Sequence, residues 1–397
     1  MDFLTNLTVR GLDLLATVFI FAIGLIILAV IVMFILDASQ SKDAIRHNYP
    51  VIGRFRDIFT HLGEFFRQYF FALDREEMPF NRAERDWIYK SAKGSNNTMP
   101  FGSTRNLNLV GTPIFVNVAF PRLDEEASDP PPVEFGPYTP NPYRLSSIIN
   151  VSAMSYGSLS KPAVQALSHG AKLAGCYLNT GEGGLAPYHL EGGCDVVFQM
   201  GTAKYGCRND HGGLDDEKLR NIAKNPQVKM IEVKLAQGAK PGKGGILPAA
   251  KVTPEIAAIR HIPVHTASIS PNRHPEVDNI AELLDFVGHV RDVSRLPTGF
   301  KTVIGAYGWV DDLCDEIERR GMESAPDFIT LDGGDGGTGA APMSLMDNVG
   351  LPLKQSLPML IDILERRGLR DRIKVIASGK LVTPAEVAWA YCAGADM

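Results

Sequence analysis

The 397-residue sequence is poor in cysteine and carries no surplus of positive charge. Its five cysteines include no Cys-x-x-Cys pair and no Cys/His cluster with zinc spacing, so neither a disulfide scaffold nor a metal site is expected. The 40 Lys and Arg are outnumbered by 45 Asp and Glu, which argues against a nucleic-acid-binding protein. Low-complexity tracts and repeats are also missing, and 45% hydrophobic residues exclude a disordered chain. The length is that of one large globular domain or two of ordinary size. The few, unpaired cysteines favour a reducing compartment.

The hydrophobic residues include one long uncharged run near the N-terminus. Leu14–Leu36 contains 23 residues, enough for a helix of roughly 34 Å to cross a hydrocarbon core of about 30 Å. The run is too long for a signal-peptide core, and no small-residue cleavage site follows it, although a buried core helix is an alternative. Four cations follow the run: Lys42, Arg46, Arg54 and Arg56. By the positive-inside rule, residues 1–40 are predicted to be a single-pass anchor with the catalytic domain in the cytoplasm.

Residues 41–145 are predicted to form a neck and a wrapping segment. Aromatic and aliphatic residues recur at helical spacing from Phe55 to Leu73, with charged residues on the other face. This amphipathic helix is expected either to lie in the membrane interface or to dock on its own globular domain. Seven prolines between Pro121 and Pro142 exclude a central strand or a long helix there, so a connection that wraps over a surface is expected.

From residue 146 to residue 397, short apolar runs alternate with helical stretches. The predicted strands are Ile148–Ser152, Tyr177–Asn179, Val196–Gln199, Met230–Leu235, Phe300–Ile304, Phe328–Leu331 and Lys374–Ala377. The predicted helices are Lys161–Ala174 (capped by Ser160), one opened by Thr253-Pro254, Asn279–Val293, Val310–Arg320, Leu353–Arg367 and Pro384–Ala393. Seven strands plus the start of an eighth at Ala395–Met397 predict a (β/α)8 TIM barrel, incomplete at strand 8. With fewer strands, the same alternation would predict an open, doubly wound sheet. His265–Ile269 is a further apolar stretch, which we assign to a loop.

Six of the predicted strands are followed by a glycine-rich or charged loop. These loops begin Ser152-Ala-Met-Ser-Tyr-Gly, Asn179-Thr-Gly-Glu-Gly-Gly, Gln199-Met-Gly-Thr-Ala-Lys, Lys234-Leu-Ala-Gln-Gly-Ala-Lys-Pro-Gly-Lys-Gly-Gly, Asp332-Gly-Gly-Asp-Gly-Gly-Thr-Gly and Ser378-Gly-Lys. In a barrel they meet on one face, where glycine lets the backbone approach a ligand and donate N–H groups to a phosphate. A single loop is explained as easily by an ordinary turn, but six together predict a site.

These motifs resemble the FMN-binding synthase domain of the glutamate synthase family. The most specific stretch is the one that starts at Lys234, followed by Pro254-Glu-Ile-Ala-Ala-Ile-Arg-His and Ile269-Ser-Pro. The N-terminal helix and Asn81-Arg-Ala-Glu-Arg are similar to a smaller, membrane-anchored branch of the family. The resemblance runs from about Ile148 to the chain end. It implies a (β/α)8 barrel, an FMN cofactor, and a reaction in which ammonia adds to 2-oxoglutarate and the imine is reduced to glutamate.

The sequence departs from the family pattern in three ways. The chain begins Met1-Asp2-Phe3 rather than with the N-terminal cysteine of a glutaminase domain, and Lys243 stands where full-length synthases usually have Glu. The family's three-cysteine iron–sulfur motif would lie beyond Met397. Because an open barrel exposes strand edges, we expect the chain to be a fragment of a longer protein, with any iron–sulfur cluster beyond Met397. A separate ammonia source and a separate electron donor, ferredoxin-like or other, are expected as partners.

The resemblance also implies which residues contact the flavin. Loops after the last strands of a barrel usually hold a phosphate. The expected contacts are Ala153, Met154, Ser155, Thr180, Gln199, Lys301, Gly333, Gly334, Asp335, Gly336, Gly337, Ser378, Gly379 and Lys380. Lys301 would stabilise negative charge on the reduced ring, although it could also be a surface lysine. Lys204, which follows the same predicted strand as Gln199, is a further candidate for flavin contact.

A dicarboxylate substrate needs fixed cations, which Lys234, Lys240 and Arg260 supply in this interpretation. Gln237 would hydrogen-bond the substrate, and Glu182 matches a family glutamate linked to ammonia arrival. As alternatives, Glu182 would cap backbone amides and Arg260 would pair with a nearby acid. His261, His265 and His274 are not spaced for a metal site.

Two other functions stay open. The chain could be a different FMN barrel oxidoreductase or isomerase with another carboxylate substrate, or a non-catalytic flavin-binding electron-transfer partner.

Overall fold

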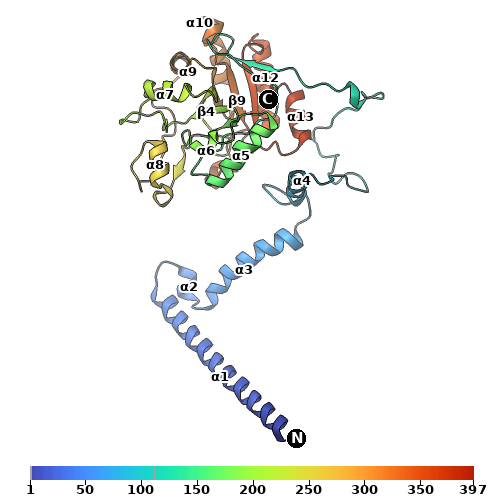
Figure 1. Cartoon of the computed structure of the whole chain (residues 1–397), viewed down its shortest axis with the longest axis vertical. Coiled ribbons are helices and arrows are strands. Elements are labelled where there is room, and N and C mark those ends of the chain that lie inside the picture. Colours follow the sequence, from blue (N-terminus) through green and yellow to red (C-terminus); the bar gives the residue numbers. More distant parts are fainter. Residues whose placement is uncertain (1, 111) are drawn as a thin grey trace. The chain divides into compact units, whose positions relative to one another are not determined.

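The chain folds into two compact units, Met1–Thr112 and Pro113–Met397. Figure 1 shows the computed structural model, which describes residues 2–110 and 112–397, with side chains from Thr8 onward. Each unit is described by itself below.

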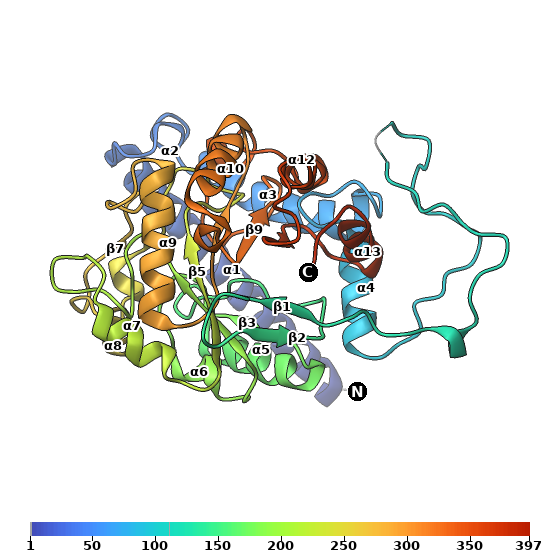
Figure 2. The same ribbon diagram turned by 90° about the horizontal axis from the view of Figure 1, so that it is seen from above.

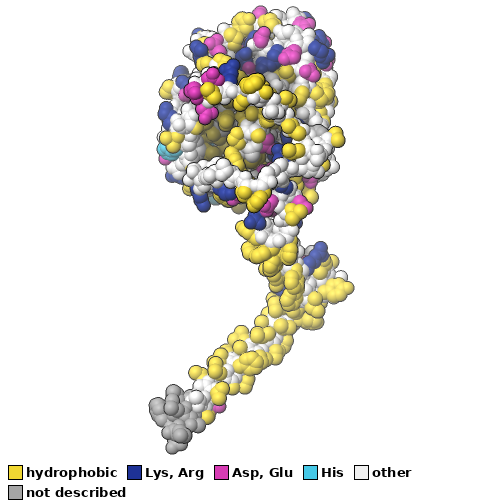
Figure 3. Space-filling model, turned by 90° about the vertical axis from the view of Figure 1, so that its right-hand side faces the viewer, with side chains coloured by type: hydrophobic (Ala, Val, Ile, Leu, Met, Phe, Trp, Pro, Cys, Tyr) yellow, Lys and Arg dark blue, Asp and Glu magenta, His cyan; other side chains and the backbone are white. Residues whose placement is uncertain are grey.

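The Met1–Thr112 unit is built from helices. They are α1 (Asp2–Ser39), α2 (Ala44–Asn48), α3 (Ile52–Phe66), the π-helix η1 (Arg67–Phe71) and α4 (Arg82–Ala92). Within α1, Thr8–Ser39 is long and apolar enough to cross a membrane, and its most apolar stretch has no buried residue. Figure 3 shows hydrophobic side chains over most of this helix. The helix expected from Phe55 is confirmed as α3 and η1.

The Pro113–Met397 unit contains a six-stranded parallel sheet with the strand order β10-β9-β8-β5-β4-β3. Its strands are β3 (Leu178–Asn179), β4 (Val196–Met200), β5 (Val228–Lys234), β8 (Thr298–Thr302), β9 (Phe328–Asp332) and β10 (Lys374–Ser378). Three of them, β4, β8 and β9, are buried along their whole length. Continuous burial is typical of parallel strands with helices outside.

One further segment lies along each edge of this sheet. The six strands and these two segments together occupy the eight strand positions of a barrel. Val151 forms a parallel bridge with Leu178 at one edge. At the other edge, the Ala377 N–H donates to the Met397 carbonyl at 2.8 Å. The two edges approach each other, since the Ser152 and Ser378 hydroxyl oxygens are 3.4 Å apart. The prediction of a (β/α)8 barrel that is incomplete at strand 8 is therefore confirmed.

Two strand predictions need correction. The segment predicted as the strand Ile148–Ser152 contributes only the single bridge at Val151, because its remaining backbone groups do not pair regularly. The predicted loop at His265–Ile269 contains β7 (Ser268–Ile269), which pairs antiparallel with β6 (Ile246–Leu247) outside the barrel sheet. A two-residue strand is too short to produce a recognisable alternation of apolar and polar residues.

Helices cover the outer face of the sheet. They are α5 (Lys161–Ala174), α6 (Pro187–Leu190), α7 (Asp216–Ala223), α8 (Pro254–Arg260), α9 (Ile280–Ser294), α10 (Gly308–Arg320), α11 (Met343–Met346), α12 (Leu353–Arg366) and α13 (Pro384–Cys392). Figure 2 shows α5, α9, α10 and α12 around the strands. The bounds of α5 match the prediction, and Gly175 ends it with φ 66°. Ser160 does occupy the N-cap position, just before α5, but its side chain makes no capping hydrogen bond, contrary to the prediction.

A short hairpin closes the amino-terminal end of the barrel. It pairs β1 (Val133–Phe135) with β2 (Tyr143–Leu145), from the proline-rich region and just after it. The buried Phe135 ring meets the Phe328 ring edge-on at a centroid distance of 5.8 Å. This segment therefore forms part of the barrel core.

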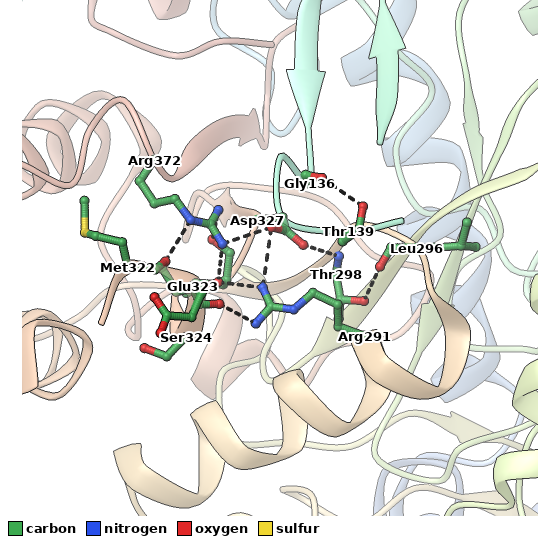
Figure 4. Close-up of polar contacts among 12 residues, drawn as sticks. Gly136, Thr139, Arg291, Leu296, Thr298, Met322, Glu323, Ser324, Asp327 and Arg372 are labelled. Carbon is green, nitrogen blue, oxygen red and sulfur yellow. Dashed lines mark hydrogen bonds and ion pairs between the residues drawn. The ribbon is translucent and has the colours of Figure 1, made fainter. Parts of the chain in front are cut away.

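A buried carboxylate holds the strands together at the same end. Figure 4 shows Arg291 and Arg372 converging on Asp327, just before β9. The guanidinium groups lie 3.5 and 3.1 Å from the carboxylate, which also accepts a 2.8 Å hydrogen bond from the Thr298 N–H. The fully buried charge of Asp327 is thus compensated twice.

Candidate active site

The interior of the barrel changes from apolar to polar along the strands. The residues that share an apolar cluster with the β1–β2 hairpin include Tyr177, Val197, Met230, Phe328 and Ile376. Two positions further along each chain segment stand Asn179, Gln199, Glu232, Thr330 and Ser378. Because alternate residues of a strand point to the same side, both sets face inward, and the polar set lies toward the carboxyl ends. This end of a barrel is where ligands bind.

A cavity of about 710 Å³ opens there. Fourteen of the predicted site residues line it: Ala153, Met154, Ser155, Glu182, Gln199, Lys234, Gln237, Lys240, Arg260, Lys301, Gly337, Ser378, Gly379 and Lys380. The volume lies in the range of pockets that hold cofactors or small ligands. The loops that looked independent along the sequence therefore meet in one place.

An ion pair joins the first loop of this site to the end of β5. The Lys234 ammonium lies 3.1 Å from a Glu182 carboxylate oxygen and donates a 3.0 Å hydrogen bond to the Gln237 side-chain oxygen. Burial alone would raise the pKa of Glu182, but Lys234, Lys240 and Arg260 outweigh it and hold that pKa below its usual value. Glu182 is therefore a carboxylate in the site, and no backbone amide within the described chain donates to it. Its pairing with Lys234 replaces the capping role considered as an alternative.

A glycine makes room for this carboxylate. A Cβ atom at Gly245, in the loop after Lys234, would lie 2.5 Å from a Glu182 carboxylate oxygen. A side chain at this position would displace the carboxylate, so the glycine allows the loop to lie against the ion pair.

Two further cations in the cavity have no carboxylate partner within the described part of the chain. Lys240 and Arg260 are each 5% exposed. Arg260, at the end of α8, donates to the Ser268 hydroxyl at 3.0 Å and to the Tyr156 carbonyl at 3.3 Å, while its buried Nε has no partner in the described structure. The alternative in which Arg260 pairs with a nearby acid is therefore wrong. Since buried charges are normally paired, this arrangement favours an anionic ligand.

Burial has a direct effect on both groups. It lowers the pKa of Lys240, and the neighbouring Lys234 lowers it further, although Glu182 acts in the opposite direction. Burial also lowers the pKa of Arg260, but a guanidinium stays protonated at any working pH. Lys240 is thus the cation that can most easily release a proton.

Lys301 on β8 lies at the inner wall of the cavity. It is 5% exposed, and its ammonium lies 3.3 Å from an Asp332 carboxylate oxygen, so the alternative of a surface lysine is wrong. Burial would lower the pKa of Lys301, but Asp332 and Glu232 outweigh it and raise the pKa above its usual value. This lysine keeps its charge.

Two acidic residues that the sequence interpretation missed organise the site. Asp332, at the end of β9, accepts from the Gly238 N–H at 2.9 Å and from the Ser378 hydroxyl at 3.1 Å, which ties together three loops. Glu232 on β5 accepts from Gln199 at 2.6 Å and from Asn179 at 2.8 Å. The sequence did contain a sign of both residues, because each is an acidic side chain inside or at the end of an otherwise apolar predicted strand.

Five predicted flavin contacts do not line the cavity: Thr180, Gly333, Gly334, Asp335 and Gly336. The Gly333, Gly334 and Gly336 amides donate to protein carbonyls instead, at 2.8, 2.8 and 2.9 Å. Asp335 accepts a hydrogen bond from the Leu353 N–H at the start of α12. The structure thus gives internal partners to Asp335 and to the three glycine amides, while flavin contact by these residues and by Thr180 stays a prediction.

Thr180 and Lys204 also have structural partners. The Thr180 hydroxyl accepts from the Gln199 N–H at 3.0 Å, and the fully buried Lys204 pairs with Glu276 at 2.9 Å. Lys204 is held away from the cavity by this ion pair.

The histidines do not gather in the structure. His261 and His265 stand in turns with φ 56° and 57°, and the buried His274 makes a 3.0 Å hydrogen bond to the Lys234 carbonyl. Over residues 2–110 and 112–397, no group of three or more His, Cys, Asp or Glu is arranged to hold a metal ion.

The fold and the cavity define a (β/α) barrel protein with a cationic pocket at the carboxyl ends of its strands. The sequence model of one family, described as "Conserved region in glutamate synthase", matches residues 123–397. The chain belongs to the glutamate synthase family.

Individual relatives agree with this assignment. The chain is 38% identical to the "Glutamate synthase large subunit-like protein YerD" of Bacillus subtilis, over 95% of this chain and 79% of that protein. It is 33% identical to the "Archaeal-type glutamate synthase [NADPH]" of Dehalococcoides mccartyi, over 62% of this chain and 46% of that protein. The chain thus matches about half the length of the archaeal-type relatives. A solved structure of flavocytochrome b2 with pyruvate bound superimposes with a TM-score of 0.40 at 17% identity, over 64% of this chain and 57% of that one.

Since Pro113–Met397 makes up less than three quarters of the chain, the similarity to the Bacillus protein extends into the N-terminal unit.

Proposed function

We propose that this chain is an FMN-dependent oxidoreductase of glutamate synthase type that acts on CH–NH2 groups. In this proposal the barrel reduces the imine formed from 2-oxoglutarate and ammonia, and it does so without a glutaminase domain in the described chain. The ammonia source and the electron donor are separate components.

The observation that carries the proposal is the buried pair of cations, Lys240 and Arg260, beside the Glu182–Lys234 ion pair. Neither cation has an internal carboxylate partner in the described chain, so the protein itself does not neutralise their charge. Removing such cations from water is unfavourable unless a counter-charge arrives, so the pocket gains most from an anionic ligand. Family membership supports 2-oxoglutarate as that ligand.

The residues of the cavity fit a flavin phosphate at the loop after β10. Gly379 and Lys380 have φ 108° and 53°, a conformation that points successive amides outward. Neither amide has an acceptor within the described residues, whereas the Gly333, Gly334 and Gly336 amides do. Ser378, Gly379 and Lys380 would therefore hold the phosphate, and Lys301 with Gln199 would face the ring system.

When bound, reduced FMN supplies the hydride for the imine carbon. Arg260 binds a substrate carboxylate, for which its planar fork is suited. Glu182, held ionised by its cationic neighbours, attracts ammonium to the site. Lys240 donates a proton to the nitrogen as the amine forms, since burial has lowered its pKa.

The first test is whether the purified full-length chain binds FMN. We expect a yellow protein, or a colourless one that takes up added FMN; a chain that does neither contradicts the proposal. The second test mixes the anaerobically reduced holoprotein with 2-oxoglutarate plus ammonium. Flavin reoxidation that requires both compounds supports the synthase reaction, and 2-oxoglutarate alone and ammonium alone are the controls.

The same experiment separates the other functions. Reoxidation by a different oxo acid, but not by 2-oxoglutarate, would identify another FMN barrel oxidoreductase. Reoxidation only by artificial electron acceptors would identify an electron-transfer partner.

The proposal includes a membrane location. Thr8–Ser39 is supported as a single-pass anchor by its length and by the cations that follow it, with the barrel in the cytoplasm. The full-length chain should stay in the membrane pellet after alkaline carbonate washing, and release into the supernatant would contradict the anchor.

A further inference from the structure

An unpartnered apolar face lies on α3 and η1, within the Met1–Thr112 unit. The side chains that form it are 43–66% exposed: Phe55, Ile58, Phe59, Leu62, Phe65, Phe66, Tyr69 and Phe70. The charged side chains Asp57 and Glu64 occupy the opposite side of α3. An exposed apolar patch this long marks an interaction surface.

The start of α3 is fastened to the end of α1. The Arg54 guanidinium donates two hydrogen bonds to the Asp37 carboxylate, at 2.8 and 2.7 Å, and the Val51 N–H donates a third at 3.0 Å. Asp37 is only 2% exposed and directly follows the uncharged run that ends at Leu36. A bidentate arginine–carboxylate pair fixes orientation as well as distance.

The short α2 braces this connection. Gln40 donates to the Asp43 carbonyl at 2.9 Å and accepts from the Asp43 N–H at 2.8 Å, and Asp43 in turn caps α2. Arg46 of α2 pairs with Asp57 of α3. A Cβ atom at Gly53 would lie 3.2 Å from the Arg46 Cα, so α2 and α3 are in close contact. These contacts fix the conformation of the segment from Asp37 to Arg54, which is called the elbow below.

We propose that this elbow sets α3 and η1 into the headgroup layer of the same lipid bilayer that α1 crosses, with the aromatic face toward the acyl chains. The inference depends on the membrane anchor proposed above. The elbow begins within one residue of the end of the apolar run, which is where the hydrocarbon core gives way to headgroups. α3 therefore starts at that depth, and Figure 3 shows hydrophobic side chains continuing from α1 along this part of the chain.

The composition of the two faces fits an anionic phospholipid surface. Aromatic and leucine side chains on one face with cations on the other are typical of helices that lie in the interface plane. Arg56 and Arg67 flank the apolar face of α3, and Lys42 stands in the elbow. These cations would meet lipid phosphates.

The experiment places environment-sensitive NBD probes on the full-length chain in vesicles of phosphatidylcholine and phosphatidylglycerol. Cys392, an exposed cysteine, is first replaced by Ser, while Cys176, Cys194, Cys207 and Cys314 are buried. Single cysteines are then introduced as Phe59→Cys or Phe66→Cys on the apolar face, Glu64→Cys on the polar face, and Ile26→Cys in the middle of α1. Glu64 is the matched control for Phe66, because it is exposed, only two residues away and on the opposite side of the helix.

We expect lipids brominated near the headgroup to quench the probes at Phe59 and Phe66, and aqueous iodide to quench the probe at Glu64 several-fold more strongly than either of them. The probe at Ile26 should be quenched by lipids brominated deep in the acyl chains. If iodide quenches the Phe66 and Glu64 probes equally, the inference is overturned while the anchor stands. Probes at Phe59 and Phe66 shielded from both quenchers would show a protein partner instead, which also overturns it. An Ile26 probe outside the bilayer would defeat the anchor and the inference together.

Discussion

The two ends of the barrel handle buried charge in opposite ways. At the amino-terminal end, Asp327 is enclosed by Arg291 and Arg372, and those guanidinium groups also bond backbone carbonyls. At the carboxyl end, Lys240 and Arg260 are almost as buried but have no carboxylate partner in the described chain. The first arrangement is complete without a ligand and supports the fold. The second is incomplete, which is what a binding site requires.

The largest expected effect is a loss of kcat in Lys240→Met, at the carboxyl end of the barrel. If Lys240 protonates the product nitrogen, its loss should lower kcat by about 1,000-fold with little change in stability. Steady-state kinetics with 2-oxoglutarate and ammonium measures the effect. Lys243→Met is the matched control, since Lys243 is an exposed lysine in the same loop and should leave kcat within a factor of a few. A similar loss in both variants would remove Lys240 from the chemistry.

A substitution at the amino-terminal end of the barrel should change the stability of the fold rather than the activity. Asp327→Asn leaves the buried Arg372 and the partly buried Arg291 without a counter-charge and should lower the free energy of unfolding by about 3 kcal/mol. Urea unfolding followed by circular dichroism measures this change. The KM for 2-oxoglutarate should not change, so a raised KM with normal stability would contradict the structural role.

The comparison is sharpest between two buried arginines. Arg260→Gln should raise the KM for 2-oxoglutarate by about 100-fold, because a charge-assisted contact is lost. It should not lower stability, since no internal ion pair is broken. Arg372→Gln is the matched control, since Arg372 is buried and pairs with Asp327. It should do the reverse, with lower stability and an ordinary KM. The same phenotype from both would erase the distinction between the two ends.

The smallest expected effect is a pH dependence of stability, which comes from His274 near the carboxyl end of the barrel. Burial and the neighbouring Lys204 lower the pKa of His274 to about 4, against 6.5 in the unfolded chain. Between these values the unfolded state binds the extra proton, so stability is full above pH 6.5 and falls as the pH drops toward 4. From pH 7 to pH 5 this amounts to about 2 kcal/mol.

His274→Gln keeps a side-chain donor but removes the titration. The variant should therefore lose about 2 kcal/mol less stability than the parent chain over that range. Equal losses in the two proteins would show that His274 titrates normally in the fold.

Much of the fold followed from local patterns. Runs such as Val196–Met200 and Phe328–Asp332 are mostly apolar and lie before a glycine-rich loop, which is why their strand character was predictable. The segment at Ile148–Ser152 was predicted too regularly, since only tertiary pairing decides whether an edge segment completes a ladder. The helices α6 and α7 were missed, because one turn or two gives too little periodicity.

The candidate site was predictable where a motif places a side chain directly after a strand. Lys234, Gln237 and Lys240 come from one such loop, and Glu182 from another. The phosphate role predicted for Gly333, Gly334 and Gly336 could not be judged from the sequence, since their amides donate to backbone carbonyls in the folded chain. Nothing local distinguishes an available amide from one that is already bonded.

The sequence by itself determined the alternation of strands and helices, the long apolar run, and the family to which the barrel belongs. These features depend on periodicity and on motifs within a few residues of each other. The tertiary structure decided which charges are compensated: Asp327 finds Arg372 across the barrel wall, whereas Arg260 meets only neutral groups. Charge compensation depends on distances between residues far apart in the chain, so only the folded molecule shows where a ligand is needed.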